Sequence, residues 1–319
     1  MTDTIVGAVT PAPWKRGNGT NYGGRVTHPA VAALATIAQW PELVEPIAEV
    51  REALTALRWH QALRRRIPES AAESRVRGAQ ASGELEGSRL PVDLVREYIA
   101  GARAWPVDPD PVEDVMRGIV AATAASEEIR GQVLGAPAQA LARLHVAAIG
   151  HLVDADARRR PGARIPADTV GRPRAAGEVC EELVDVGPPP APGEVAQRLS
   201  LVSELVRGHG AVPAVVLCAV VHAEVATVRP FTRGNAIVAR ALERALVQAT
   251  GLDPTGVAVT ELGHFRQTMP AYVGALAAYA TGSRDGVRIW LEHCCQAYAA
   301  AAQEGRIVAD AVLAGRLPR

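Results

Sequence analysis

Apolar residues recur at helical spacing along most of this chain. Within residues 41–66, Leu43, Ile47 and Val50 lie three or four positions apart, which places them on one face of a helix. Residues 211–227 are apolar on all sides, a pattern typical of a helix buried inside a domain. The same reasoning predicts further helices over residues 29–39, 69–87, 92–101, 110–130, 136–153, 193–208, 235–250, 265–281 and 284–303. The expected fold is therefore mainly α.

Two stretches lack this periodicity. Residues 1–27 are rich in glycine, proline and threonine, and we expect a flexible leader there. Its residues 17–24 are similar to a phosphate-binding loop, but no predicted strand precedes them, so a tail is the preferred interpretation. Residues 154–192 contain many prolines and glycines. They are predicted to form a loop with one short β-hairpin at residues 164–170.

The composition excludes several classes of protein. The 319 residues carry 34 basic and 34 acidic side chains, and this balance gives no reason to expect nucleic-acid binding. Lys15 is the only lysine in the sequence. P-loop enzymes, protein kinases and Schiff-base enzymes all need a lysine placed within the site, so these classes are excluded. No apolar run reaches the roughly 18 residues that span a bilayer, and no signal-peptide pattern is present. We therefore expect a cytoplasmic protein that does not contact a membrane.

The cysteines give no framework for the fold. Cys180, Cys218, Cys294 and Cys295 are too few for a disulfide scaffold in so long a chain. Cys294 and Cys295 directly follow His293, and the three side chains together could suggest a metal site. No Cys-x-x-Cys spacing supports one. Buried thiols are the preferred interpretation, and no metal-binding residues are predicted.

One segment, residues 229–240, has the local chemistry of an anion site. Pro230 and Gly234 force a tight loop, and Asn235 is suited to cap the helix that follows. A helix N-terminus presents free N–H groups and a positive dipole, both of which attract anions. Arg229 and Arg233 flank this end of the helix, and a further arginine follows one turn along. We therefore predict anion or nucleotide binding by Arg229, Arg233, Gly234, Asn235 and Arg240.

The same segment resembles the Fic-family motif His-Pro-Phe-x-(Asp/Glu)-Gly-Asn-Gly-Arg-x-x-Arg. The matching positions are Pro230, Phe231, Gly234, Asn235 and Arg240. Four other positions differ: where the family has its catalytic histidine, acidic metal ligand, second glycine and first arginine, this chain has Arg229, Arg233, Ala236 and Ile237. The resemblance therefore implies a Fic-like helical fold with a degenerate active-site motif.

The substitutions remove the chemistry of the motif. In active relatives the histidine takes a proton from a target hydroxyl, which then attacks a nucleotide phosphate. Arg229 cannot act as that base because a guanidinium stays protonated in proteins, and losing a general base costs roughly 10²–10⁴ in rate. Arg233 cannot hold Mg²⁺ as the family's carboxylate does. No catalytic residue and no Mg²⁺ are expected. Binding of ATP or another nucleotide is an open alternative, although the methyl group of Ala236 intrudes where glycine allows a phosphate to approach closely.

A second matching segment lies upstream. Residues 81–87 resemble the (Ser/Thr)-x-x-x-Glu-(Gly/Asn) inhibitory helix of autoinhibited Fic proteins, with Ser82, Glu86 and Gly87 at the motif positions. The resemblance implies that Glu86 pairs with Arg240, either as a regulatory latch or as an internal structural strut. Weaker matches lie at residues 161–164, 187–192, 272–276 and 289–292, so the resemblance covers roughly residues 70–305.

This resemblance divides the chain into segments. They are the leader 1–27, an N-terminal helical region 28–68, a Fic-like core 69–255 with the inhibitory-helix-like segment, and C-terminal helices 256–319. In the family, the hairpin expected near residue 164 is a flap that positions a target segment by strand-like hydrogen bonds.

Histidines outside the motif are candidates for a replacement base. His222 lies seven residues before Arg229, and therefore on a similar helix face. A core histidine with satisfied hydrogen bonds is the preferred interpretation. His145 and His264 have no partner visible in the sequence.

Three classes of function remain open at this stage. The favoured one is a catalytically inactive binding or regulatory module with an unknown protein partner. The second is an enzyme of altered chemistry that transfers a nucleotidyl, phosphate or nucleotide-sugar group to a protein. The third is a structural subunit, with a homodimer formed through the N-terminal helices.

Overall fold

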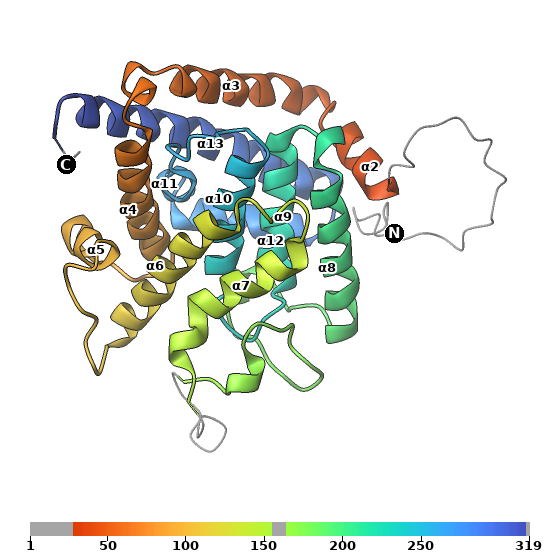
Figure 1. Cartoon of the computed structure of the whole chain (residues 1–319). Coiled ribbons are helices and arrows are strands. Elements are labelled where there is room, and N and C mark those ends of the chain that lie inside the picture. The colour runs from red at the N-terminus through yellow and green to blue at the C-terminus, as the bar shows by residue number, and fades with distance from the viewer. Residues whose placement is uncertain (1–27, 155–163, 317–319) are drawn as a thin grey trace.

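The computed structural model describes residues 28–154 and 164–316, so the predicted leader lies outside the described residues. Helices make up most of the described chain (Figure 1). Its α-helices are α2 (Pro29–Ile37), α3 (Pro41–Arg58), α4 (Ile67–Leu85), α5 (Val92–Ile99), α6 (Pro111–Ile129), α7 (Pro137–Ile149), α8 (Pro192–Arg207), α9 (Ala214–Val228), α10 (Asn235–Ala249), α11 (Thr260–Arg266), α12 (Met269–Ala280) and α13 (Arg284–Leu313). This confirms the predicted mainly-α fold class.

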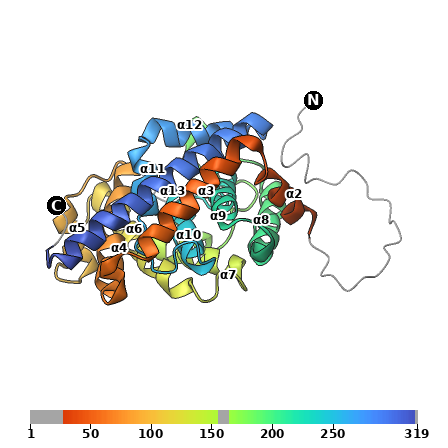
Figure 2. The ribbon, with the colours of Figure 1, turned by 90° about the horizontal axis from the view of Figure 1, so that it is seen from above.

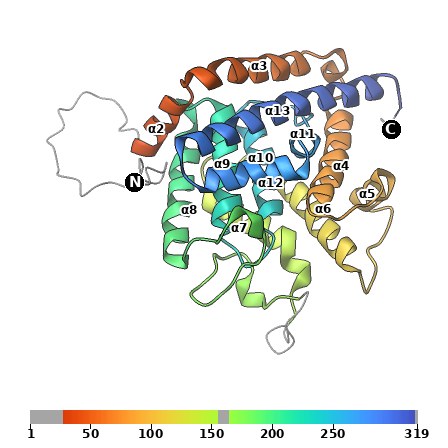
Figure 3. The same cartoon turned by 180° about the vertical axis from the view of Figure 1, so that it is seen from behind.

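The helices α9 and α10 form the centre of the molecule, as Figure 1 shows. Every residue of α9 from Val215 to Val228 is buried, which agrees with its apolar sequence on all sides. Such a helix needs neighbours all around it. The helices α8, α12 and α13 pack against α9, while α6 and α7 cover α10. Seen from behind, α12 and α13 lie in front of the central pair (Figure 3).

The longest helix, α13, crosses the whole domain. From above, α3 runs alongside it (Figure 2), and the apolar face that predicted α3 is buried there. The helix α11 crosses α13 at Gly263, where a Cβ atom would lie only 2.0 Å from the carbonyl oxygen of Ala297. Glycine is therefore required at this crossing. Within the described ranges, no helix is both long enough and apolar enough to cross a membrane.

The structure corrects three predicted boundaries. The helix expected over residues 41–66 stops at Arg58, because the His60 side chain caps a separate 3₁₀ turn. The helix expected over residues 265–281 begins only at Met269, because Thr268 has a φ of 71° and its side chain caps α12; residues 260–266 form the separate helix α11, which the sequence pattern did not predict. The last helix continues to Leu313 instead of ending at residue 303.

The predicted hairpin is also corrected. Residues 164–170 form no strand; Val153 and Ile165 make a single isolated parallel bridge, and Ala167–Thr169 form a 3₁₀ turn. Prolines on both sides of this turn lack the N–H groups that a hairpin ladder needs. The loop instead packs against the 229–240 segment through Arg174, whose backbone N–H donates to the carbonyl of Pro230 over 2.7 Å.

Candidate functional site

The loop between α9 and α10 is held closed by one side chain. Asn235 Oδ1 accepts from the N–H of Phe231 over 2.9 Å, and Asn235 Nδ2 donates to the carbonyl of Phe231 over 3.0 Å. The ring of His145 stacks on Phe231 with centroids 3.6 Å apart. The expected role of Asn235 as N-cap is wrong in detail, because Gly234, with φ of 81°, occupies the cap position. Asn235 ties the loop together instead.

Arg229 does not flank the helix N-terminus as the sequence suggested. Its side chain is buried, with 1% exposure. The guanidinium donates to the carbonyls of Glu182, Leu183 and Gly187 over 3.0, 3.1 and 2.6 Å. Burial lowers the pKa of Arg229 from its usual value, and the nearby charge of Glu182 offsets only part of this effect. Arg229 therefore anchors the chain segment 182–187 to the motif loop.

Glu182 occupies the N-terminus of α10. Its carboxylate accepts from the N–H groups of Gly234 and Asn235 over 2.6 and 2.9 Å, and from Asn235 Nδ2 over 2.9 Å. These are the donors that the sequence assigns to an anion. Burial, together with the negative charge of Glu86, raises the pKa of the Glu182 carboxyl. Sequence reasoning missed this residue because it lies in the irregular loop, where no spacing or motif marks it.

The structure brings Glu86 and Arg240 together. Arg240 Nη2 donates to Glu86 Oε1 over 2.5 Å, and Arg240 Nε donates to the Ser82 hydroxyl over 2.9 Å. The exposures differ: 1% for the Arg240 side chain and 24% for Glu86. Burial works against the charge on Arg240, but the Glu86 carboxylate outweighs this effect, so the pKa of Arg240 is raised. Gly87 follows with φ of 77° and ends the inhibitory-helix-like segment.

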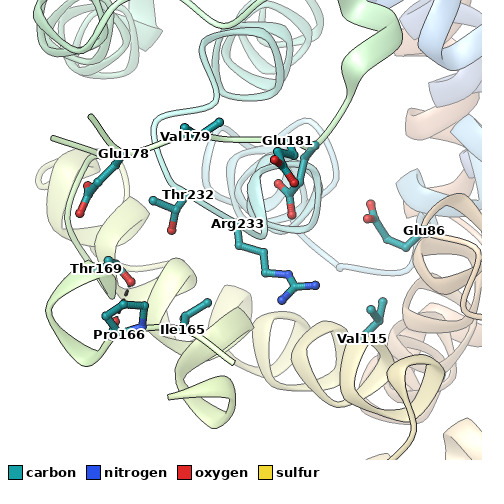
Figure 4. Close-up of a pocket in the computed structure, with 11 residues that line it drawn as sticks. Glu86, Val115, Ile165, Pro166, Thr169, Glu178, Val179, Glu181, Thr232 and Arg233 are labelled. Atoms are coloured by element: carbon teal, nitrogen blue, oxygen red, sulfur yellow. Dashed lines mark hydrogen bonds between the residues drawn. The ribbon is translucent and has the colours of Figure 1, made fainter. Parts of the chain in front are cut away.

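A cavity of about 710 Å³ opens beside these groups (Figure 4). Arg233 extends into it, and the carboxylates of Glu86 and Glu181 lie on other sides of the same space. Its charged lining consists of Glu86, Glu178, Glu181, Glu182 and Arg233, with apolar contacts from Val115, Ile165, Pro166 and Val179. Neither Arg229, Asn235 nor Arg240 lines the cavity. The cavity is therefore mostly acidic.

Neither of the two histidines near the motif, His145 and His222, lines the cavity. His145 Nδ1 accepts from the N–H of Gly171 over 2.9 Å, and its Nε2 lies 3.1 Å from the carbonyl of Arg233. Burial lowers the pKa of His145 to about 4, so it is neutral. His222 is fully buried behind the motif, where its Nε2 lies 2.8 Å from the Tyr272 hydroxyl. Within the described residues, no histidine lines the cavity.

Solved structures of Fic-domain proteins match this chain over most of its length. Fic-1 of Caenorhabditis elegans (residues 134–508) matches with a TM-score of 0.60 and 16% identity, covering 86% of this chain and 74% of that one. A Fic family protein from Desulfovibrio desulfuricans matches with a TM-score of 0.57 and 20% identity, covering 83% and 74%. The chain has the Fic fold.

A third Fic-fold match is a Fic domain containing signaling protein from Bacteroides thetaiotaomicron. Its TM-score is 0.55 at 13% identity, and the match covers 83% of this chain and 98% of that one. No family model and no curated protein sequence matches this chain. At these identities the likeness extends to the Fic fold and no further, so the function rests on this chain's own residues.

Proposed function

We propose that this Fic-fold protein does not catalyse nucleotidyl transfer and acts as a binding or regulatory module. One observation carries the proposal: the N–H groups of Gly234 and Asn235, where the resemblance expects a phosphate, hold the Glu182 carboxylate. A carboxylate at a helix N-terminus satisfies the same donors and the same dipole as a phosphate would. The protein's own chain thus fills its anion site.

The missing general base supports the same proposal. Arg229 occupies the position of the catalytic histidine, and its donors are bound to main-chain carbonyls. A group that stays protonated and does not line the cavity cannot take a proton from a target hydroxyl. The losses of base and metal ligand together leave no residue of the motif that performs the first step of transfer.

The charge of the cavity favours a positively charged ligand. Four glutamates and Arg233 make up its charged lining, and Glu181 has no hydrogen bond or ion pair among the described residues. A nucleoside triphosphate would bring further negative charge into this space and be repelled. A segment of a partner protein that carries arginine or lysine next to an apolar side chain complements both the glutamates and Val179. Such a segment is the ligand that we propose.

We expect pyrophosphate to leave the melting temperature of the wild-type protein unchanged and to raise that of a Glu182→Ala variant. Removing the carboxylate frees the N–H groups of Gly234 and Asn235, and a ligand at about a hundred times its Kd stabilises by roughly 2.7 kcal/mol. Differential scanning fluorimetry with ATP and pyrophosphate measures this. Glu181→Ala is the matched control, because Glu181 lines the same cavity but does not contact these N–H groups.

Two results would contradict the inactive-module proposal. One is tight binding of ATP by the wild-type protein. The other is transfer of radiolabel from α-³²P-ATP to a protein in the presence of Mg²⁺.

The proposed ligand is tested with a fluorescent arginine-rich peptide. We expect this peptide to bind the wild-type protein and to bind the Glu181→Gln variant at least about tenfold more weakly, with affinity falling as the salt concentration rises. Equal affinity for both proteins would exclude the cavity as its site.

The alternative is an enzyme of altered chemistry that is switched off by its own glutamate. The retained contact between Glu86 and Arg240 favours it, because in autoinhibited relatives this pair blocks a nucleotide phosphate. Such an enzyme would transfer label only after Glu86→Gly opens the site. If the Glu86→Gly variant binds no nucleotide and transfers no label, the pair of Glu86 and Arg240 is a structural strut and not a regulatory latch.

A further inference from the structure

A second cluster of ionisable side chains lies in the interior, away from the acidic cavity. The three neighbouring helices α9, α10 and α11 each contribute one residue: His222, Glu243 and His264. All three side chains have 0% exposure. Their ligand atoms all lie within 4.8 Å of one another. The proposed binding function uses none of them.

The distances within the cluster are those between ligands of one metal ion. His222 Nδ1 lies 3.1 Å from Glu243 Oε1, and His264 Nε2 lies 3.0 Å from Glu243 Oε2. With zinc bond lengths of about 2.0–2.1 Å, neighbouring ligand atoms of a tetrahedral site lie roughly 3.3 Å apart. Small side-chain adjustments therefore place all three atoms around a common centre.

The orientation of His222 is explained by a metal and not by hydrogen bonding. Its Nδ1 atom is fully buried and makes no hydrogen bond within the described residues, although a Glu243 oxygen lies only 3.1 Å away. The two atoms are close but poorly aligned with each other. Buried polar atoms without a partner are rare in native structures and call for an explanation such as a bound ion. A lone pair directed at a shared cation supplies that partner.

Each member of the cluster also has an outer hydrogen-bond partner. His222 Nε2 lies 2.8 Å from the Tyr272 hydroxyl, and His264 Nδ1 lies 3.1 Å from His293 Nε2. The Tyr298 hydroxyl donates to Glu243 over 2.6 Å. Metal-binding histidines hold their second ring nitrogen in this way, and metal-binding carboxylates are likewise hydrogen-bonded. The outer contacts fix the rings and the carboxylate in the orientation that a metal needs.

The charge balance points in the same direction. A fully buried carboxylate needs a compensating positive charge. The nearest arginines along α10 are already paired: Arg240 with Glu86, and Arg244 with Glu261 over 3.2 Å. Neutral imidazoles offer no net charge. A divalent cation would compensate Glu243 and use both histidines at once.

We propose that His222, Glu243 and His264 bind a divalent transition-metal ion, with Zn²⁺ as the best chemical match. Two imidazoles and one carboxylate form a ligand set that zinc accepts, whereas Mg²⁺ and Ca²⁺ prefer oxygen ligands alone. Because the cluster is closed to solvent, the metal is structural and enters as the chain folds. It ties together α9 and α10, the two helices that carry the motif loop, and α11.

The direct test is the metal content of the full-length protein, expressed without a polyhistidine tag in zinc-supplemented medium. Inductively coupled plasma mass spectrometry is expected to find about one zinc per chain after dialysis. Unfolding and refolding with EDTA is expected to lower the melting temperature by at least about 5 °C, and refolding with ZnSO₄ to restore it. Less than about 0.1 metal ion per chain, with the same melting temperature in EDTA and in zinc, overturns the proposal.

A pair of variants locates the site. Glu243→Gln keeps the shape of the side chain but loses its charge, and zinc content is expected to fall at least about tenfold. Glu224→Gln is the matched control, since Glu224 is a buried carboxylate two residues after His222 whose partners are Arg198 and Tyr279. It is expected to keep its zinc. Wild-type zinc content in Glu243→Gln excludes this site; if that variant does not fold, His222→Gln and the wild-type measurement decide the question.

Discussion

Replacing Glu86 with alanine is expected to lower the free energy of unfolding by about 3–5 kcal/mol, because it strands a buried charge. Arg240 is only 1% exposed, and its other side-chain partners, the hydroxyls of Ser82 and Tyr272, are neutral. The reverse change, Arg240→Met, is expected to cost less. Glu86 is 24% exposed and lines the cavity, so water can solvate it once its partner is gone. Urea denaturation of both variants measures this asymmetry.

The control for this prediction is Glu84→Ala, on the same helix. Glu84 pairs with Arg89, whose side chain is 80% exposed, so the loss is expected to stay below about 1 kcal/mol. Equal, small losses at positions 84 and 86 would show that Arg240 is solvated without its partner, and the strut interpretation would fail. Recovery of Glu86→Ala by pyrophosphate would instead favour the latch, since an added anion would then replace the carboxylate beside Arg240.

Replacing Gly263 with alanine is expected to destabilise the fold by about 3 kcal/mol, at the upper end of the usual range for overpacking. The added Cβ would lie 2.0 Å from the carbonyl oxygen of Ala297 and 3.3 Å from the Cβ of Ala301. The first of these is a backbone atom in the middle of α13, so no side-chain rotation relieves the clash. The two helices have to separate, and His264 moves with α11. Thermal and urea unfolding measure the loss.

Gly274→Ala is the matched control for the helix crossing. Gly274 also lies within a helix, α12, but a Cβ there meets nothing within 4 Å. Alanine is the better helix former by about 1 kcal/mol, so this variant is expected to gain stability. If the stability falls in Gly263→Ala and rises in Gly274→Ala, the loss is due to the α11–α13 contact. A neutral Gly263→Ala variant would mean that the crossing is loose enough to accept a methyl group.

The loop between α9 and α10 is held in shape by its own side chains. Asn235 closes the loop, and Gly234 adopts the conformation that starts α10. The functional groups around this frame are bound to other parts of the same chain: Arg229 to the carbonyls of residues 182–187, and the helix N-terminus to Glu182. In the proposed function, the glutamates that line the cavity select its ligand. The proposed preference for a basic protein segment follows from that lining.

Much of this arrangement could be predicted from the sequence, because it depends on local rules. Periodic apolar residues mark the helices, the unbroken apolar run marks α9 as buried, and Pro230 with Gly234 marks the tight loop. The meeting of Glu86 and Arg240 also follows from the motifs alone, once the resemblance is recognised. The helix boundaries are predicted less well: α12 begins at Met269 and not at residue 265, because Thr268 caps it, and the short helix α11 was missed.

Only the tertiary structure decided which distant groups meet. Glu182 reaches the Gly234 amide because the irregular loop folds back over the motif, and no local pattern encodes that path. His222, Glu243 and His264 lie far apart in the sequence and on three different helices. The packing of α9, α10 and α11 nevertheless brings the three side chains together. Arg229 likewise keeps its charge but points its guanidinium into the protein. Local structure depends on neighbours in the chain, whereas these contacts depend on how whole helices and loops pack, and that packing determines what the site can bind.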